Sequence, residues 1–214
     1  VNEDAGTMTF TVTLSNPSTL EVTVDYISDG TEGTATENVD YDAVNGSLTF
    51  APGVLTQTIT VPITDDYIAE GSETFDMILS NATNATIADT TGLGQILDEP
   101  TPGNEDTVNV TLAGDTAVTE GATASYVVTL SQAAITPMTI TVTTGHITTE
   151  DGDLVPVTQQ VTFAIGATQA TLTVSNTDDA YAEGDETYAV ALSGAYAGGG
   201  FEAVNVDTTP VNTV

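Results

Sequence analysis

Apolar and polar residues alternate along most of this chain. In residues 8–14 a Met, a Phe, a Val and a Leu occupy every second position, with a threonine between each pair. A period of two is that of a β-strand with one buried face, and no segment shows the 3.6-residue period of an amphipathic helix. Further runs of this kind occupy residues 22–26, 59–63, 126–130, 140–142 and 172–174. The pattern predicts an all-β protein.

The strand-like runs are short and the sequence repeats itself. Gly, Pro, Asn and Asp separate the runs at about ten-residue intervals, a spacing typical of antiparallel sandwiches. Residues 64–75 are echoed by residues 177–188, residues 47–53 by 160–166, and the strand Phe10–Leu14 by Tyr126–Leu130. Two copies of one domain type are therefore expected. We predict two tandem antiparallel β-sandwiches, residues 1–99 and 107–214, joined by an acidic linker rich in Pro and Gly over residues 100–106.

The charge of the chain is entirely negative. It holds 31 Asp and Glu residues, no Lys and no Arg, so no carboxylate can pair with a basic side chain. Repulsion between clustered carboxylates must then be relieved by water, salt, protonation or a bound cation. Nucleic acid and anionic membrane surfaces are unfavourable partners, and no apolar run approaches the length of a membrane span. With no Cys for disulfides, a bound metal is the expected reinforcement of an extracellular protein.

Acidic residues recur at matching places in the two copies. The main cluster of each copy lies between two apolar runs and is therefore predicted to occupy a loop between two strands. Such loops gather at the ends of a sandwich, so carboxylates remote in sequence can meet there. The recurring residues are Glu3, Asp40, Asp65, Asp66, Glu70, Glu73 and Asp98 in the first copy and Glu120, Asp153, Asp178, Asp179, Glu183 and Glu186 in the second.

Carboxylate clusters of this kind favour calcium over other metals. Calcium takes six to eight oxygen ligands in flexible geometry, whereas magnesium requires tighter octahedral geometry and keeps its waters. Zinc and copper prefer imidazole or thiolate, and the chain has one His and no Cys. Solvated acidic turns are the simpler alternative, because Asp and Gly are common turn residues. The repeated spacing, without any basic residue to neutralise it, favours Ca²⁺.

The first copy resembles a Calx-β domain, the family found in sodium–calcium exchangers and in many bacterial surface proteins. The matching stretches are Val1–Gly6, Asp40-Tyr41, Gly46–Gly53 and Asp65–Phe75. The resemblance implies a seven-stranded immunoglobulin-like sandwich, with calcium bound at one end in the calcium-sensing members. It implies as ligands Glu3, Asp40, Asp65, Asp66, Glu70, Glu73 and Asp98, together with the backbone carbonyl of Ile68.

The second copy is similar to the immunoglobulin-like extender domains of large repeats-in-toxin adhesins. It keeps the acidic positions, and Tyr181 stands where the first copy has Ile68. It departs from the first copy in having Asp153-Leu154 in place of the Asp-Tyr pair, and it lacks a clear counterpart of Asp98. Its site is therefore expected to be incomplete, or to be completed by a following domain. The candidate ligands are Glu120, Asp153, Asp178, Asp179, Tyr181, Glu183 and Glu186.

These observations favour a structural role. The leading hypothesis is a calcium-binding, calcium-rigidified tandem extender segment, a piece of a large secreted bacterial cell-surface adhesin, with calcium ions and neighbouring domains of the same chain as partners. The alternative is a calcium-dependent module that binds an extracellular peptide or glycan, with Tyr196 and Phe201 of the tail Gly194–Val206 lining its site. Calcium sensing requires an effector domain that is not recognised here. An enzyme is not expected, because no nucleophile–base pair is recognisable.

Overall fold

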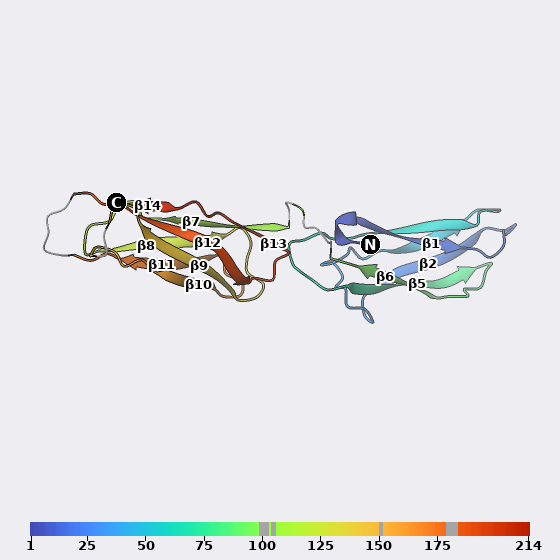
Figure 1. Cartoon of the computed structure of the whole chain (residues 1–214). Coiled ribbons are helices and arrows are strands. Elements are labelled where there is room, and N and C mark those ends of the chain that lie inside the picture. The colour runs from blue at the N-terminus through green and yellow to red at the C-terminus, as the bar shows by residue number, and fades with distance from the viewer. Residues whose placement is uncertain (99–102, 104–105, 150–151, 179–183) are drawn as a thin grey trace. The chain divides into compact units, whose positions relative to one another are not determined.

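The computed structural model describes residues 1–98, 103, 106–149, 152–178 and 184–214, which form two compact units (Figure 1). The first unit lies in the first half of the chain and the second in the second half, except that residues 67–69 group with the second unit. Every regular element in these residues is a β-strand, apart from one short 3-10 turn, η1, at Glu3–Ala5. Among the residues described, no helix has the length and hydropathy needed to cross a membrane. The prediction of an all-β protein with two tandem immunoglobulin-like sandwiches is confirmed.

The first unit packs a two-stranded sheet on a four-stranded one. The small sheet has the order β1-β4, and the large sheet has the order β3-β2-β5-β6, with every pair antiparallel. The threonines of β1 face outward while Met8 is buried, as the alternation predicts. The strands are β1 (Thr7–Thr13), β2 (Val22–Asp29), β3 (Asn45–Phe50), β4 (Thr56–Pro62), β5 (Glu73–Thr83) and β6 (Thr91–Ile96).

The second unit packs two four-stranded sheets. Their orders are β11-β8-β7-β13 and β10-β9-β12-β14, and β7 pairs in parallel with β13 while the other pairs are antiparallel. The strands are β7 (Thr107–Gly114), β8 (Thr123–Leu130), β9 (Met138–His146), β10 (Thr158–Phe163), β11 (Gln169–Ser175), β12 (Tyr188–Gly198), β13 (Ala203–Val206) and β14 (Val211–Thr213).

The two units differ in how their apolar side chains are packed. The second unit has one continuous core, whereas the buried residues of the first unit form two separate clusters. The larger cluster of the first unit contains Tyr41, which is fully buried and stacks on Phe75 with ring centroids 4.2 Å apart. In the second unit the buried hydroxyl of Tyr126 lies 3.1 Å from that of Tyr188 and 2.5 Å from Oγ1 of Thr213.

The hydroxyl of Tyr126 is hydrogen-bonded, whereas that of Tyr41 has no partner in the described residues, and this difference is testable. Tyr126→Phe should lower the free energy of unfolding of the second unit by about 1–3 kcal/mol, because it removes the buried hydroxyl that donates to the Tyr188 hydroxyl oxygen. Tyr41→Phe should leave the first unit unchanged or slightly more stable, because the Tyr41 hydroxyl is buried and has no hydrogen-bond partner in the described residues. Urea unfolding of each variant measures both effects, and equal losses would contradict this account.

Candidate metal centre

Asp40 is fixed at one end of the first unit by a tight turn. Asn38 adopts a left-handed backbone conformation, with φ at 61°, and donates its N–H to the Tyr41 carbonyl at 2.8 Å. The turn places the N–H of Thr36 on Oδ2 of Asp40, whose side chain is 9% exposed. Thr64 donates its N–H to the Asp40 carbonyl at 3.0 Å. The start of the acidic loop between β4 and β5 is thereby held beside Asp40.

Three carboxylates from two separate segments meet at this end. One oxygen each from Asp40, Glu70 and Glu73 lie within 4.8 Å of one another. Glu73 is the first residue of β5, and Glu70 lies three residues earlier in the acidic loop. The turn carrying Asp40 and the loop carrying the two glutamates are therefore brought together. We call this group the carboxylate triad.

The triad is electrostatically unfavourable without a cation. The pKa of Glu73 is raised from 4.5 to about 7, first by burial, then by a hydrogen bond with Asp40 and by the charges of Asp40 and Glu70. The pKa of Glu70 is also raised, by burial and by the charges of Asp40, Asp66 and Asp98. Oε2 of Glu73 is buried, and none of the described residues hydrogen-bonds it. Because the chain holds no Lys or Arg, no basic side chain can relieve this repulsion, whereas a proton or a bound cation would.

Asp98 extends the acidic end beyond the triad. Its Oδ2 accepts the backbone N–H of Glu70 at 3.2 Å, while its Oδ1 is buried and lacks a hydrogen-bond partner within the described part of the chain. Glu3, which is 5% exposed in η1, has a carboxylate oxygen within 4.8 Å of one from Asp98. The N–H of Glu3 donates to the Leu97 carbonyl at 3.0 Å, which holds the two segments together.

The other ligands predicted for the first copy of the repeat lie in the loop between β4 and β5. Asp65 is exposed, whereas Asp66 and Ile68 are partly buried. Asp66 is close enough for its charge to raise the pKa of Glu70, but neither Asp65 nor Asp66 belongs to the triad. Asp65, Asp66 and the carbonyl of Ile68 therefore remain predicted ligands. The N–H of Thr36, which contacts Asp40, could not have been predicted, because a backbone donor carries no residue preference.

The second unit gathers its acidic residues around a hollow of about 600 Å³ at one end. Glu120, Asp153 and Glu186 line this hollow, and the N–H of Thr177 donates to the Asp153 carbonyl at 2.8 Å. This bond repeats the one between Thr64 and Asp40, so Asp153 is the structural counterpart of Asp40. Leu154, which is 2% exposed, packs in the core in the place of Tyr41.

The acidic side chains of the second unit lie farther apart than those of the carboxylate triad, within the part of the unit that the structure describes. Asp178 is exposed and close to Gly121, beside Glu120. In the described residues of the second unit, no three carboxylate oxygens lie within 4.8 Å of one another. Three predicted ligands, Asp179, Tyr181 and Glu183, lie outside the described residues, as does most of the predicted linker 100–106. The ligand set of the second unit therefore stays a prediction.

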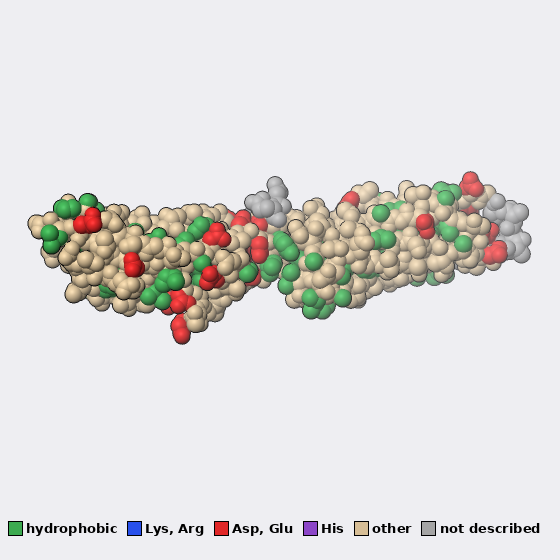
Figure 2. Space-filling view, turned by 180° about the vertical axis from the view of Figure 1, so that it is seen from behind, with side chains coloured by type: hydrophobic (Ala, Val, Ile, Leu, Met, Phe, Trp, Pro, Cys, Tyr) green, Lys and Arg blue, Asp and Glu red, His purple; other side chains and the backbone are tan. Residues whose placement is uncertain are grey.

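The donors at the end of the first unit fit a hard divalent cation. All of the side chains that meet there are carboxylates, which suit Ca²⁺ or Mg²⁺ better than zinc or copper. They come from the turn around Asp40, the loop before β5 and the segment after β6, and such spread ligands suit the flexible geometry of calcium. On the face shown in Figure 2, acidic side chains appear on both units and no basic side chain does.

The tail Gly194–Val206, predicted as the site of the alternative binding function, is mostly sheet. β12 extends to Gly198 and β13 begins at Ala203. Phe201 packs against the core of the second unit, while Tyr196 is 46% exposed. One exposed aromatic ring is thus available for a glycan or peptide. An array probed in calcium and in EDTA would test this prediction.

The raised pKa of Glu73 has a consequence for stability. Between its ordinary value of 4.5 and about 7, the folded state binds more protons at Glu73 than the unfolded state. The stability of the metal-free protein should therefore fall as the pH rises through this window and level off above it. Thermal melts in EDTA from about pH 5 to about pH 8 measure this slope. Glu73→Gln should remove part of the slope, and an identical slope in both proteins would contradict the assignment.

Comparisons with known proteins agree with the two-part organisation. The Calx-beta domain model matches residues 1–99, and the LapA domain model matches residues 106–214. The Adhesion G-protein coupled receptor V1 of Danio rerio is 39% identical over 87 residues, which are 41% of this chain and 1% of that protein. This chain therefore spans only a small part of that relative.

Solved calcium-binding domains are also similar. The calcium binding domain CBD12 of CALX1.1 matches 90% of this chain and 74% of its own at 20% identity, with a TM-score of 0.44. The apo-form Calx CBD1 domain matches 46% of this chain and 87% of its own at 27% identity, with a TM-score of 0.42.

Proposed function

Because this chain belongs to the LapA domain family over residues 106–214 and carries a Calx-beta domain over residues 1–99, we propose that it is a calcium-rigidified extender segment of a large secreted bacterial adhesin. Domains of these two kinds serve binding and adhesion. The adhesion receptor among its relatives supports a place at the cell surface. The segment would hold a binding domain of the parent protein away from the cell.

The carboxylate triad carries the proposal. Asp40, Glu70 and Glu73 present oxygens within 4.8 Å of one another in a chain that has no basic side chain to neutralise them. In this proposal the triad binds Ca²⁺ together with Asp98, whose buried Oδ1 accepts no hydrogen bond from the described residues. The ion would replace the proton that the raised pKa of Glu73 indicates.

Calcium would stiffen the segment by linkage. The triad joins the turn at Asp40 to the loop before β5, and Asp98 joins that loop to the end of β6. An ion that binds only the folded arrangement stabilises it by about 2.7 kcal/mol at a hundredfold excess over Kd. Removing the ion leaves the carboxylates to repel one another, which loosens three segments at the same end of the sandwich.

Distance distributions between the two units test the rigidifying role. The chain has no Cys, so Leu20→Cys and Ile165→Cys, at positions 59% and 68% exposed, accept one spin label in each unit. Calcium should narrow the distribution relative to EDTA. Asp40→Asn should widen it again, while Glu21→Gln, at an exposed position before β2, should not. Equal widths in calcium and EDTA would remove the extender role and leave only an ion site.

A place outside the cell has its own test. Antibody against this segment should label intact cells that express the parent protein, and external protease should remove the signal. Signal only after permeabilisation would contradict the proposal.

A further inference from the structure

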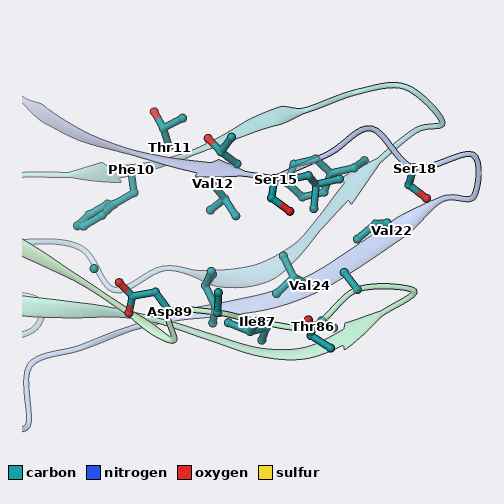
Figure 3. A pocket seen from close by; sticks show the side chains of 18 of the residues that line it. Phe10, Thr11, Val12, Ser15, Ser18, Val22, Val24, Thr86, Ile87 and Asp89 are labelled. Atoms are coloured by element: carbon teal, nitrogen blue, oxygen red, sulfur yellow. The ribbon is translucent and has the colours of Figure 1, made fainter.

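The inward face of β2 ends on a buried hydroxyl instead of an apolar side chain. Figure 3 shows Val22 and Val24 of β2 on the side of the strand that faces β1, and both belong to a buried cluster. Ser28 occupies the same face, because alternate residues of a strand point to one side. Its side chain is 4% exposed, and buried polar side chains are nearly always hydrogen-bonded. The hydrogen bonds of Ser28 therefore indicate what its hydroxyl does.

The Ser28 hydroxyl closes the base of the loop between β2 and β3. Ser28 donates its N–H to the Val44 carbonyl at 2.8 Å, which is one half of a regular antiparallel pair. In the other half, Val44 donates its N–H to Oγ of Ser28 at 2.9 Å, where a regular pair would use the Ser28 carbonyl. The hydroxyl also donates to the Val44 carbonyl at 3.3 Å. We call this arrangement the hydroxyl clamp.

The second unit repeats the hydroxyl clamp with a different residue. Thr144, which is 8% exposed, is the fourth inward-facing residue of β9, as Ser28 is of β2. It donates its N–H to the Val157 carbonyl at 3.0 Å, and Val157 donates its N–H to Oγ1 of Thr144 at 2.9 Å. The clamped residues are 16 positions apart in the first unit and 13 in the second. The clamp is therefore tied to something that both loops share despite their different lengths.

Both loops carry a candidate metal ligand at the same distance from the clamp. Asp40 stands four residues before Val44, and Asp153 stands four residues before Val157. The two loops differ in length before the aspartate and not after it, because the aspartate and the valine keep the same separation. The segment from the aspartate to the clamped valine is thus the shared part of the two loops, and we call it the ligand arm.

In the first unit the ligand arm crosses from the large sheet to the small one. At one end Val44 is clamped to β2 of the large sheet. Towards the other end, Asp42 donates its N–H at 3.1 Å to the carbonyl of Pro62, the last residue of β4 in the small sheet. Thr64, just beyond β4, donates its N–H to the Asp40 carbonyl at 3.0 Å. The position of Asp40 is therefore fixed from both sheets, and the clamp supplies the attachment to the large one.

We propose that Ser28 is a positioning residue for the candidate ligand Asp40, and that Thr144 has the same role for Asp153. The inference rests on the proposed calcium function, but Ser28 itself lies outside the carboxylate triad. Without the hydroxyl, the Val44 N–H must reach the Ser28 carbonyl or bond to water, and either change moves the ligand arm. Calcium–oxygen distances span only about 2.3–2.6 Å, so a small displacement of Asp40 weakens the site.

Calcium titration of the whole chain by calorimetry tests the proposal at the site that Asp40→Asn removes. Ser28→Ala should weaken calcium binding there at least about tenfold, at a temperature where the variant is fully folded. A hydroxyl that only stabilised the fold would lower the melting temperature and leave Kd unchanged, because all molecules would still be competent to bind. Ser28→Thr, which supplies the hydroxyl found in the second unit, should keep the affinity. Ser47→Ala is the matched control, because its hydroxyl donates to the Val24 carbonyl at 3.4 Å within the same pair of strands.

Hydrogen exchange in EDTA gives a second readout that needs no metal. Ser28→Ala should speed exchange at Thr36 and Thr64, whose N–H groups bond the side chain and the carbonyl of Asp40, whereas Ser47→Ala should not. Unchanged exchange at both amides would overturn the proposal, and so would an unchanged Kd in Ser28→Ala. If the unmodified chain binds no calcium, the proposed calcium function fails, and the exchange result alone then supports or overturns the positioning of Asp40 by the clamp.

Discussion

Excess calcium should raise the melting temperature of the first unit by about 10–20 °C over its value in EDTA. The expected stabilisation at a hundredfold excess over Kd is about 2.7 kcal/mol, and each kcal/mol shifts the melting temperature of a domain of this size by about 4–8 °C. The increase arises because Asp40, Glu70 and Glu73 repel one another in the metal-free state. Magnesium should give a much smaller increase, because ligands from separate loops do not impose octahedral geometry.

Single substitutions test whether the carboxylate triad causes the calcium-dependent increase in melting temperature. Asp40→Asn and Glu73→Gln should each remove most of the calcium-dependent increase while raising the melting temperature in EDTA, because each deletes one of the repelling charges. Glu21→Gln should change neither value, because Glu21 is exposed and outside the triad. A calcium increase that survives in both triad variants would place the ion elsewhere. No increase in the unmodified chain would show that the acidic loops are solvated turns.

Tyr41→Ala should lower the free energy of unfolding of the first unit by about 3–5 kcal/mol. The Tyr41 ring is completely buried and stacks on Phe75 at 4.2 Å, with an angle of 15° between the ring planes. Its removal leaves a cavity in the cluster that supports the end of the sandwich. Because Tyr41 directly follows Asp40, the substitution should also displace the carboxylate and weaken calcium binding. Urea unfolding and calcium titration by calorimetry measure the two effects.

A comparison of three variants separates the structural support given by the Tyr41 ring from calcium binding by the Asp40 carboxylate. Tyr41→Phe keeps the stacked ring and should keep both stability and calcium affinity. Asp40→Asn should lose affinity but not the stability in EDTA. Tyr41→Ala should lose both. Calcium affinity unchanged in Tyr41→Ala would show that the turn carrying Asp40 holds its position without the ring, and the structural argument for Tyr41 would be wrong.

The candidate site was only partly predictable from the sequence. The repeat and the acidic spacing pointed to loops at one end of the sandwich, because loops between strands must lie at its ends. They did not show which of the acidic residues lie closest together. Asp65 and Asp66 follow β4 in the most acidic part of the loop, yet the carboxylates that approach one another within 4.8 Å are those of Asp40, Glu70 and Glu73. Which carboxylates converge depends on the turn at Asn38 and on the bond from Thr64 to Asp40. Neither contact leaves a pattern in the sequence.

The sequence by itself determined the strands, their buried faces and the two repeats, because a period of two reflects local geometry that each strand carries alone. Only the tertiary structure decided how well those faces are covered. Residues 10–14 and 126–130 show the same alternation, yet Tyr126, Val128 and Leu130 are buried, whereas Phe10, Val12 and Leu14 are partly exposed. The physical reason is that the residues covering the apolar face of a strand come from elsewhere in the chain, so the pattern within one strand cannot specify how well that face is covered.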